Sequence, residues 1–130
     1  MHPVIRFNSN HFDLSLEPEN PINPIRGVSL LHWLKKQLPT ELSMTEPDAE
    51  DWGWYSCVIW EGRTYLIGAC AYDEPDGNHE WLLQFEKHRS MKEWLLGRAK
   101  MTQEDPCFKF IRDLICGESS FTHVDIEYGP

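Results

Sequence analysis

The sequence has no long hydrophobic run. Its longest apolar stretches are only a few residues, such as LIGACAY at 66–72, whereas a membrane-spanning helix needs about 20 residues. The N-terminal residues MHPVIRFNSN show neither the basic start nor the apolar centre of a secretory signal. We therefore expect a soluble, cytoplasmic protein with no membrane partner.

Cysteine pairs of the CxxC type are also missing, and with them the strongest zinc and redox signatures. The strand register given below separates Cys57 from Cys70 by about 13 Å, and Cys107 and Cys116 lie at opposite ends of one predicted helix. These separations are too long for a disulfide. We expect four free thiols, packed as small hydrophobic residues in a reducing compartment.

No motif in the chain names a reaction. The GxSxG, HExxH, Walker A and dinucleotide-type glycine patterns are all absent. Cys107 is the best-placed nucleophile because a helix N-terminus favours a thiolate, but Glu104 and Asp105 beside it oppose that effect. The polar residues 73–80 have the composition of a tight turn and lack the spacing of a calcium loop. We expect no metal site and no cofactor, and a non-enzymatic role is favoured.

Positive charge is scarce, because 12 Lys and Arg stand against 21 Asp and Glu, for a formal net charge of −9. Affinity for nucleic-acid backbones depends on Lys and Arg, so nucleic acid is a disfavoured partner, and a basic protein would suit the chain better. Acid is concentrated at 46–51 (EPDAED) and 73–76 (DEPD), and the Lys and Arg of the second half all fall within 87–112. We interpret this basic segment as the solvated side of a helix.

What the chain does contain is typical of a single globular domain over residues 1–130. Hydrophobic residues make up 41% and include six tryptophans, which is enough for a core at this length. Alternation predicts an N-terminal hairpin from 3–8 and 11–17. A Pro-rich structured loop at 17–27 then leads to a helix with Ser29 as N-cap and Pro39 at its end.

Two further helices and a strand complete the chain. Ser90 and Glu93 have the spacing of a capping box at the start of the first helix. Asp105 and Gly117 are typical of the start and the end of the second, and residues 121–128 alternate as a final strand. The residues expected to face inward are Met91, Trp94 and Leu95 on the first helix, Phe110, Ile111, Leu114 and Ile115 on the second, and Val124, Ile126 and Tyr128 on the strand.

The clearest part of the pattern is a three-strand meander. Its strands are expected at 52–60, 63–72 and 79–87, after a short strand near 41–45. The two-residue loop after Trp60 sets that residue opposite Arg63, and the DEPDGN turn sets Tyr72 opposite His79. We predict an α+β fold, with an antiparallel or mixed sheet around the meander 52–87 and about three helices packed mainly on one face.

This register divides the meander into two faces, because alternate residues of a strand point to opposite sides. One face is almost wholly apolar and is expected to be the core side: Tyr55, Cys57, Ile59, Leu66, Gly68, Cys70, Trp81, Leu83 and Phe85. The other face mixes aromatic and charged residues, among them Trp52, Trp54, Val58, Trp60, Tyr65, Glu80 and Glu86.

The second face carries our main functional hypothesis. Left uncovered, it would form a large aromatic patch with a charged rim, and such patches usually mark contact sites. We expect a small acidic domain that binds a protein partner, either a basic protein or a second copy in a dimer. The alternative is that the first helix or the N-terminal hairpin covers this face. The expected partner-binding residues are Asp51, Trp52, Trp54, Trp60, Arg63, Tyr65 and Glu80.

In overall character the chain is similar to immunity proteins that neutralise bacterial toxins, because it is small, acidic, rich in sheet aromatics and without catalytic motifs. The resemblance implies an inhibitor-like protein that binds its target. A second hypothesis is a small enzyme or ligand-binding domain. Its pocket would lie between the sheet and the helices and would include polar residues such as Tyr65, His123 or Asp125.

Overall fold

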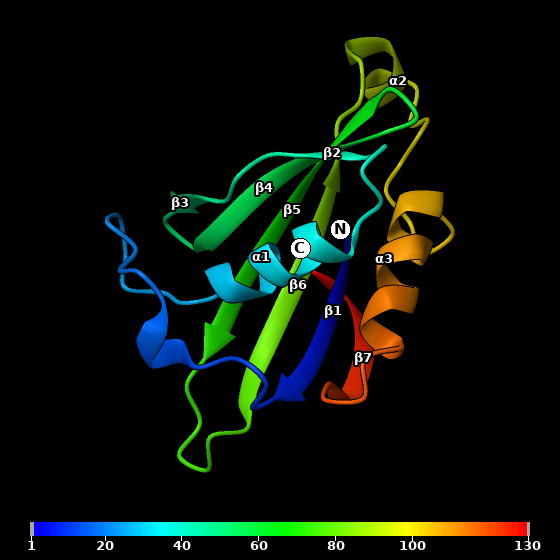
Figure 1. Ribbon diagram of the computed structural model, residues 1–130. Coiled ribbons are helices and arrows are strands. Elements are labelled where there is room, and N and C mark those ends of the chain that lie inside the picture. The colour runs from blue at the N-terminus through cyan, green and yellow to red at the C-terminus, as the bar shows by residue number, and fades with distance from the viewer. Residues whose placement is uncertain (1, 130) are drawn as a thin grey trace.

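The computed structural model describes residues 2–129 and shows an antiparallel sheet with helices beside it (Figure 1). The seven strands are β1 (His2–Ser9), β2 (Ser43–Met44), β3 (Asp48–Glu50), β4 (Gly53–Trp60), β5 (Arg63–Tyr72), β6 (His79–Lys87) and β7 (Thr122–Gly129). The helices are a 3-10 turn (Leu14–Leu16), α1 (Val28–Gln37), α2 (Met91–Leu95) and α3 (Pro106–Cys116). The predicted α+β class is confirmed.

The strand order brings the first and last strands together. It runs β2-β4-β5-β6-β1-β7, with β3 also paired to β4, so β1 lies between β6 and β7 (Figure 1). The predicted N-terminal hairpin is therefore wrong, because distant strands occupy both edges of β1. The chain turns instead into the 3-10 helix, where Asp13 accepts a hydrogen bond from the backbone of Ser15 and Leu14 enters the core.

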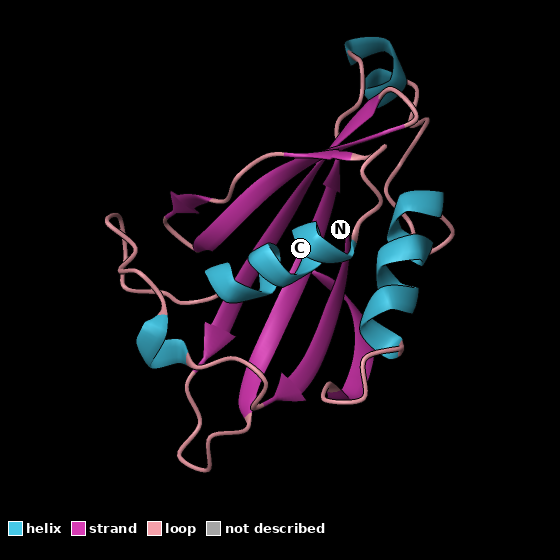
Figure 2. Cartoon of the chain, viewed as in Figure 1, coloured by secondary structure: helices cyan, strands magenta, loops and turns pink. Residues whose placement is uncertain are grey.

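Helices α1 and α3 cover the same face of the sheet, and α2 stands beyond its end (Figure 2). α1 crosses β4 and β5. α3 packs over β6, where the ring centroids of Phe108 and Phe85 are 4.9 Å apart. The side chains that these two helices bury are Val28, Leu30, Leu31 and Leu34 from α1, and Cys107, Phe108, Ile111 and Ile115 from α3.

The start of α1 depends on a carboxylate from the Pro-rich loop 17–27. Ser29 was predicted as the N-cap, but Gly27 takes that position without a side-chain cap. The buried Glu17 carboxylate accepts the backbone N–H groups of Gly27 and Ser29, each at 2.9 Å, and also the hydroxyl of Ser29. Gly27 has a φ of 145°, and a β-carbon there would stand 2.8 Å from the backbone of β5. The loop is thus structured, as predicted, and sets α1 tightly on the sheet.

The register of the meander is predicted correctly for one strand pair and wrongly for the next. Between β4 and β5, Trp60 lies opposite Arg63, as expected from the two-residue turn. Between β5 and β6, Tyr72 lies opposite Glu80 instead of His79. His79 bonds within the preceding turn, where its Nδ1 accepts the backbone N–H of Glu74. A shift of one residue in the pairing places each side chain of β6 on the same face as the other set of β4 and β5 residues.

The predicted core side of β4 and β5 is consequently wrong. The fully buried side chains of β6, which are Trp81, Leu83 and Phe85, lie under the helices. They share this face with the β4 and β5 residues that were predicted for the other side: Trp54, Val58, Tyr65 and Ile67. Neither α1 nor α3 covers the other face of the sheet, and we call it the uncovered face. The residues of β1, β4, β5 and β6 that define it are Val4, Tyr55, Cys57, Leu66, Gly68, Cys70, Leu82 and Gln84.

The last helices begin as predicted, and of their predicted inward residues only Ile111 and Ile115 are buried. The capping box of Ser90 and Glu93 is present at α2, and Asp105 caps α3. The predicted buried stripe of α2 is wrong, because the structure buries no residue of this helix. On α3, Phe110 and Leu114 are only half-buried, while Cys107 and Phe108 reach the core. On β7, Val124 and Ile126 are half-buried and Tyr128 is exposed.

Candidate functional site

The aromatic residues predicted to bind a partner lie mostly beneath the helices. Trp54 is buried, and its Nε1 donates a hydrogen bond to the carbonyl of Ile25 at 3.1 Å. Tyr65 is 2% exposed, and Trp60 packs against Phe110 of α3 at 5.4 Å between ring centroids. The first helix therefore covers this face, as in the alternative hypothesis, and α3 covers part of it as well.

The remaining predicted residues are spread over separate places. Trp52 precedes β4 and lies on the uncovered face, where its ring contacts Gly68. Asp51 is exposed, and Glu80 faces Arg6 on the uncovered face at 3.8 Å. Arg63 makes a two-pronged ion pair with Glu93, at 2.9 and 3.1 Å. The structure does not bring the seven predicted residues into one patch.

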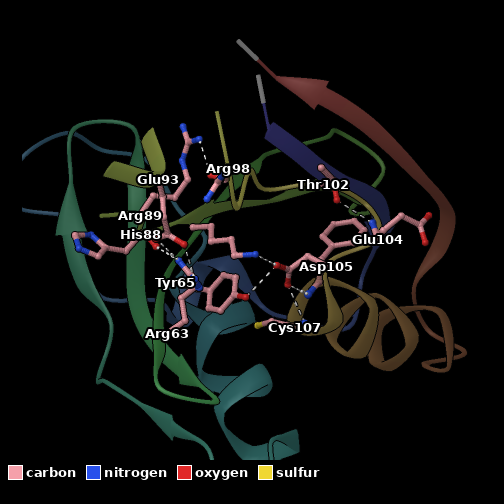
Figure 3. A network of polar contacts seen from close by, with 12 residues as sticks. Arg63, Tyr65, His88, Arg89, Glu93, Arg98, Thr102, Glu104, Asp105 and Cys107 are labelled. Carbon is pink, nitrogen blue, oxygen red and sulfur yellow. Dashed lines mark hydrogen bonds and ion pairs between the residues drawn. The ribbon is translucent and has the colours of Figure 1, made fainter. Parts of the chain in front are cut away.

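A buried polar network joins the sheet to the start of α3 (Figure 3). One oxygen of the Asp105 carboxylate accepts the backbone N–H groups of Cys107 and Phe108. The other accepts the Tyr65 hydroxyl at 2.9 Å and the Lys87 ammonium at 2.8 Å. Each oxygen thus receives two donors, which leaves this carboxylate no free position from which to take a proton from a substrate. The network is suited to fixing α3 against the sheet.

The acid–base properties of this network also argue against catalysis. Burial, and then the hydrogen bond to Asp105, raises the pKa of the Tyr65 hydroxyl. Burial raises the pKa of the Cys107 thiol to about 12, so this thiol is protonated at neutral pH and is a poor nucleophile. The sequence correctly placed Cys107 at a helix N-terminus beside acidic residues.

The uncovered face contains a large groove. It has a volume of about 1130 Å³ and lies between the sheet and the segment that contains α2. Its apolar lining comes from Cys57, Leu66, Met91, Trp94, Met101 and Tyr128. Its ionisable lining includes His2, Glu86, His88, Arg89 and Lys100.

A second hollow continues along the same face. It has a volume of about 220 Å³ and is lined by Trp52, Cys70 and Leu82, among others. Tyr128 lines both hollows. Sequence reasoning missed this face because it assigned Cys57, Leu66 and Cys70 to the core, although it recognised the alternation of the strands.

The apolar side chains of α2 are the other feature that the sequence did not reveal. Met91, Trp94, Leu95 and Leu96 are between 54% and 73% exposed. Their exposure could have been inferred from the shortness of the helix, because a helix of five residues has no second turn with which to form a broad buried stripe.

Other kinds of site find no support in the described chain. Within residues 2–129, no three His, Cys, Asp or Glu side chains are grouped so as to hold a metal ion. No helix in this range is long and apolar enough to cross a membrane. Comparisons with protein-family models, curated proteins and solved structures find no match to this chain.

Proposed function

We propose that the chain is a non-enzymatic protein-binding domain that contacts its partner, another protein or a second copy of itself, through the uncovered face. The observation that carries this proposal is the groove of about 1130 Å³ on that face, lined by apolar side chains. Monomeric proteins rarely leave a broad apolar surface open to water unless it binds something.

The position of the groove in the sheet supports this role. Its floor includes Cys57 and Leu66, which are paired with each other on β4 and β5, two strands that each have neighbours on both sides. A floor made of hydrogen-bonded strands is ordered before the partner arrives, so binding loses little conformational entropy. Trp94 and Tyr128 at its sides are of the residue types that most often anchor partners.

Charge around the uncovered face supports recognition of a protein. Glu80 and Glu127 flank Arg6 on one side of this face, and Glu86 lines the groove. Asp51 lies exposed beside Trp52. Carboxylates at the rim of an interface mainly steer association and select partners.

Catalysis is less well supported than binding. The four donors on Asp105 occupy both of its oxygens, and His123 and Asp125 are exposed on the edge strand β7.

All four cysteines are free, which favours a reducing compartment such as the cytoplasm as the place of action.

The experiment that tests the proposal compares two leucine variants. Leu66→Arg places a charge on the floor of the groove, and Leu16→Arg makes the same change at a leucine that is 81% exposed elsewhere. A partner is first captured with the native chain and purified, and self-association is measured by analytical ultracentrifugation. We expect Leu66→Arg to weaken the measured association at least about tenfold, or 1.4 kcal/mol. Equal affinities for both variants, with both folded, would rule out this face.

A further inference from the structure

The segment 88–101, which contains α2, holds an apolar surface in solvent. Met91, Trp94, Leu95 and Leu96 are all exposed, yet the segment is tied down at both ends. The capping box fixes its first turn, and Met101 at its far end is buried. An apolar surface that is held in place and that no described residue covers is prepared for a contact from outside.

The same contacts anchor this segment to the sheet. Arg63 of β5 binds the Glu93 carboxylate with two hydrogen bonds and also the carbonyl of His88 (Figure 3). Arg89 donates to the carbonyl of Arg98 and so closes the segment on itself. The position of α2 relative to the groove is therefore set by the sheet.

The charge of the segment is opposite to that of the whole chain. Arg89, Lys92, Arg98 and Lys100 form no ion pair with any residue that the structure describes, whereas its acidic residue, Glu93, is neutralised by Arg63. The segment is thus a local cationic surface on a chain with a formal net charge of −9. A partner gains most binding energy at this surface if it carries carboxylates. The acidic remainder of the chain repels such carboxylates and so disfavours binding of the partner elsewhere on the protein.

The cations and the apolar groups meet at the groove. Arg89 and Lys100 line it together with Met91 and Trp94, and Leu66 of the sheet forms part of its floor. A flat lipid surface could touch α2 but could not fill a groove whose floor is a β-strand. A nucleic-acid backbone would offer nothing to the apolar floor. An extended segment of a protein supplies both chemistries, because its successive side chains point in opposite directions.

We infer that the groove between α2 and the uncovered face binds an acidic segment of a partner protein, with a large apolar side chain of that segment seated against Trp94 and Leu66. This inference rests on the proposed function and adds the chemistry of the partner. Carboxylates of the segment pair with Arg89 and Lys100 at the rim of the groove. The apolar side chain displaces water from its floor.

The experiment uses the full chain and two pools of synthetic peptides labelled with fluorescein. The acidic pool alternates Asp or Glu with Leu, Phe or Trp, and the basic pool has Lys in place of each acid. We expect the acidic pool to raise the fluorescence anisotropy with an affinity at least about tenfold above that of the basic pool. The difference should shrink at about 1 M salt, where exposed charges are screened.

Matched variants locate the binding. Arg89→Glu and Trp94→Ala should each weaken binding of the acidic pool at least about tenfold. Lys36→Glu, which reverses an exposed charge on α1, and Ile22→Ala, which truncates an exposed apolar residue of the 17–27 loop, should leave it unchanged. Circular dichroism melting checks that every variant is folded.

Several results would overturn the inference. They are equal binding of the two pools, no binding of the acidic pool, preferential binding to vesicles of phosphatidylserine and phosphatidylcholine, or self-association that is lost in Trp94→Ala. The proposed function has a separate outcome. If Leu66→Arg abolishes binding of a partner while Arg89→Glu and Trp94→Ala do not, the uncovered face still binds protein and only the acidic segment is excluded.

Discussion

The indole of Trp52 occupies the space that a side chain on Gly68 would need, since a β-carbon built at Gly68 would stand 2.5 Å from two atoms of that ring. We predict that Gly68→Ala lowers the free energy of unfolding by about 1–3 kcal/mol because it overpacks this contact. In a Trp52→Ala background the same change should be neutral or stabilising, since glycine within a strand is unfavourable in itself. Urea unfolding of the four proteins in this cycle measures the coupling. Additive effects would show that the two residues do not contact.

The buried ion pair of Asp105 with Lys87 gives a second prediction. Asp105→Asn keeps an acceptor for the cap of α3 but leaves the Lys87 ammonium, 14% exposed, without its carboxylate. We expect a loss of about 3–5 kcal/mol in the free energy of unfolding, measured by urea denaturation. Glu104→Gln is the control, because Glu104 forms an exposed pair with Lys109 and should change stability by less than about 1 kcal/mol. Equal effects of both changes would contradict the structural role of the network.

The sequence could predict those parts of the fold that local chemistry determines. The pairing of β4 with β5 follows from a two-residue turn that allows one register. The pairing of β5 with β6 does not, because the loop between them is longer and β5 is apolar on both faces. Leu66 and Cys70 alternate with Ile67 and Ala69, so periodicity gives no reason to prefer either face as the core.

The sequence did not place the candidate site, since none of the seven predicted partner-binding residues lines the groove. Gly53, with a φ of 148°, lies where the chain enters β4, and a β-carbon there would stand 2.4 Å from the carbonyl of Ala69. The strand alternation therefore does not extend back across Gly53, and Trp52 and Trp54 reach opposite faces. Which face the helices cover depends on contacts between distant parts of the chain, which a local pattern does not contain.

Two buried serines on the sheet should respond oppositely to the same substitution. The hydroxyl of Ser56 has no hydrogen-bond partner among the described residues, whereas that of Ser9 donates to the carbonyl of Ser120 and accepts the N–H of His11. We expect Ser56→Ala to be neutral or stabilising by up to about 1 kcal/mol, and Ser9→Ala to be destabilising by about 1–3 kcal/mol. Thermal and urea unfolding measure both. A large loss of stability in Ser56→Ala would reveal a partner for its hydroxyl.

The cysteines should differ in their reaction with iodoacetamide. Cys116 is exposed, while Cys107 is buried and the pKa of its thiol is raised to about 12. We expect the folded protein at pH 8 to be alkylated at Cys116 first and at Cys107 only after unfolding in urea, because the thiolate is the reactive form. Peptide mapping by mass spectrometry identifies the labelled residue, and Cys116→Ser serves as the control. Rapid labelling of Cys107 in the folded protein would restore it as a candidate nucleophile.

The ion pair between Glu93 and Arg63 should make the stability of the protein depend on acidic pH. Hydrogen bonds from Arg63, followed by the backbone N–H of Ser90, lower the pKa of Glu93 from 4.5 to about 2. Because the pKa is lower in the folded state, the contribution of Glu93 to stability is fully present above about pH 4.5 and is lost as the pH falls toward 2. Glu93→Gln removes the charge but retains a side chain that can complete the capping box.

We therefore expect the melting temperature of Glu93→Gln to lie below that of the native chain by a constant amount above about pH 5, and the difference to disappear as the pH falls toward 2. Glu61→Gln, at an exposed turn residue of the same hairpin, is the control and should show no such convergence. Calorimetry over this pH range measures the differences. A gap between the native chain and Glu93→Gln that stays constant down to the lowest pH would show that Arg63 does not hold the ionised form of Glu93.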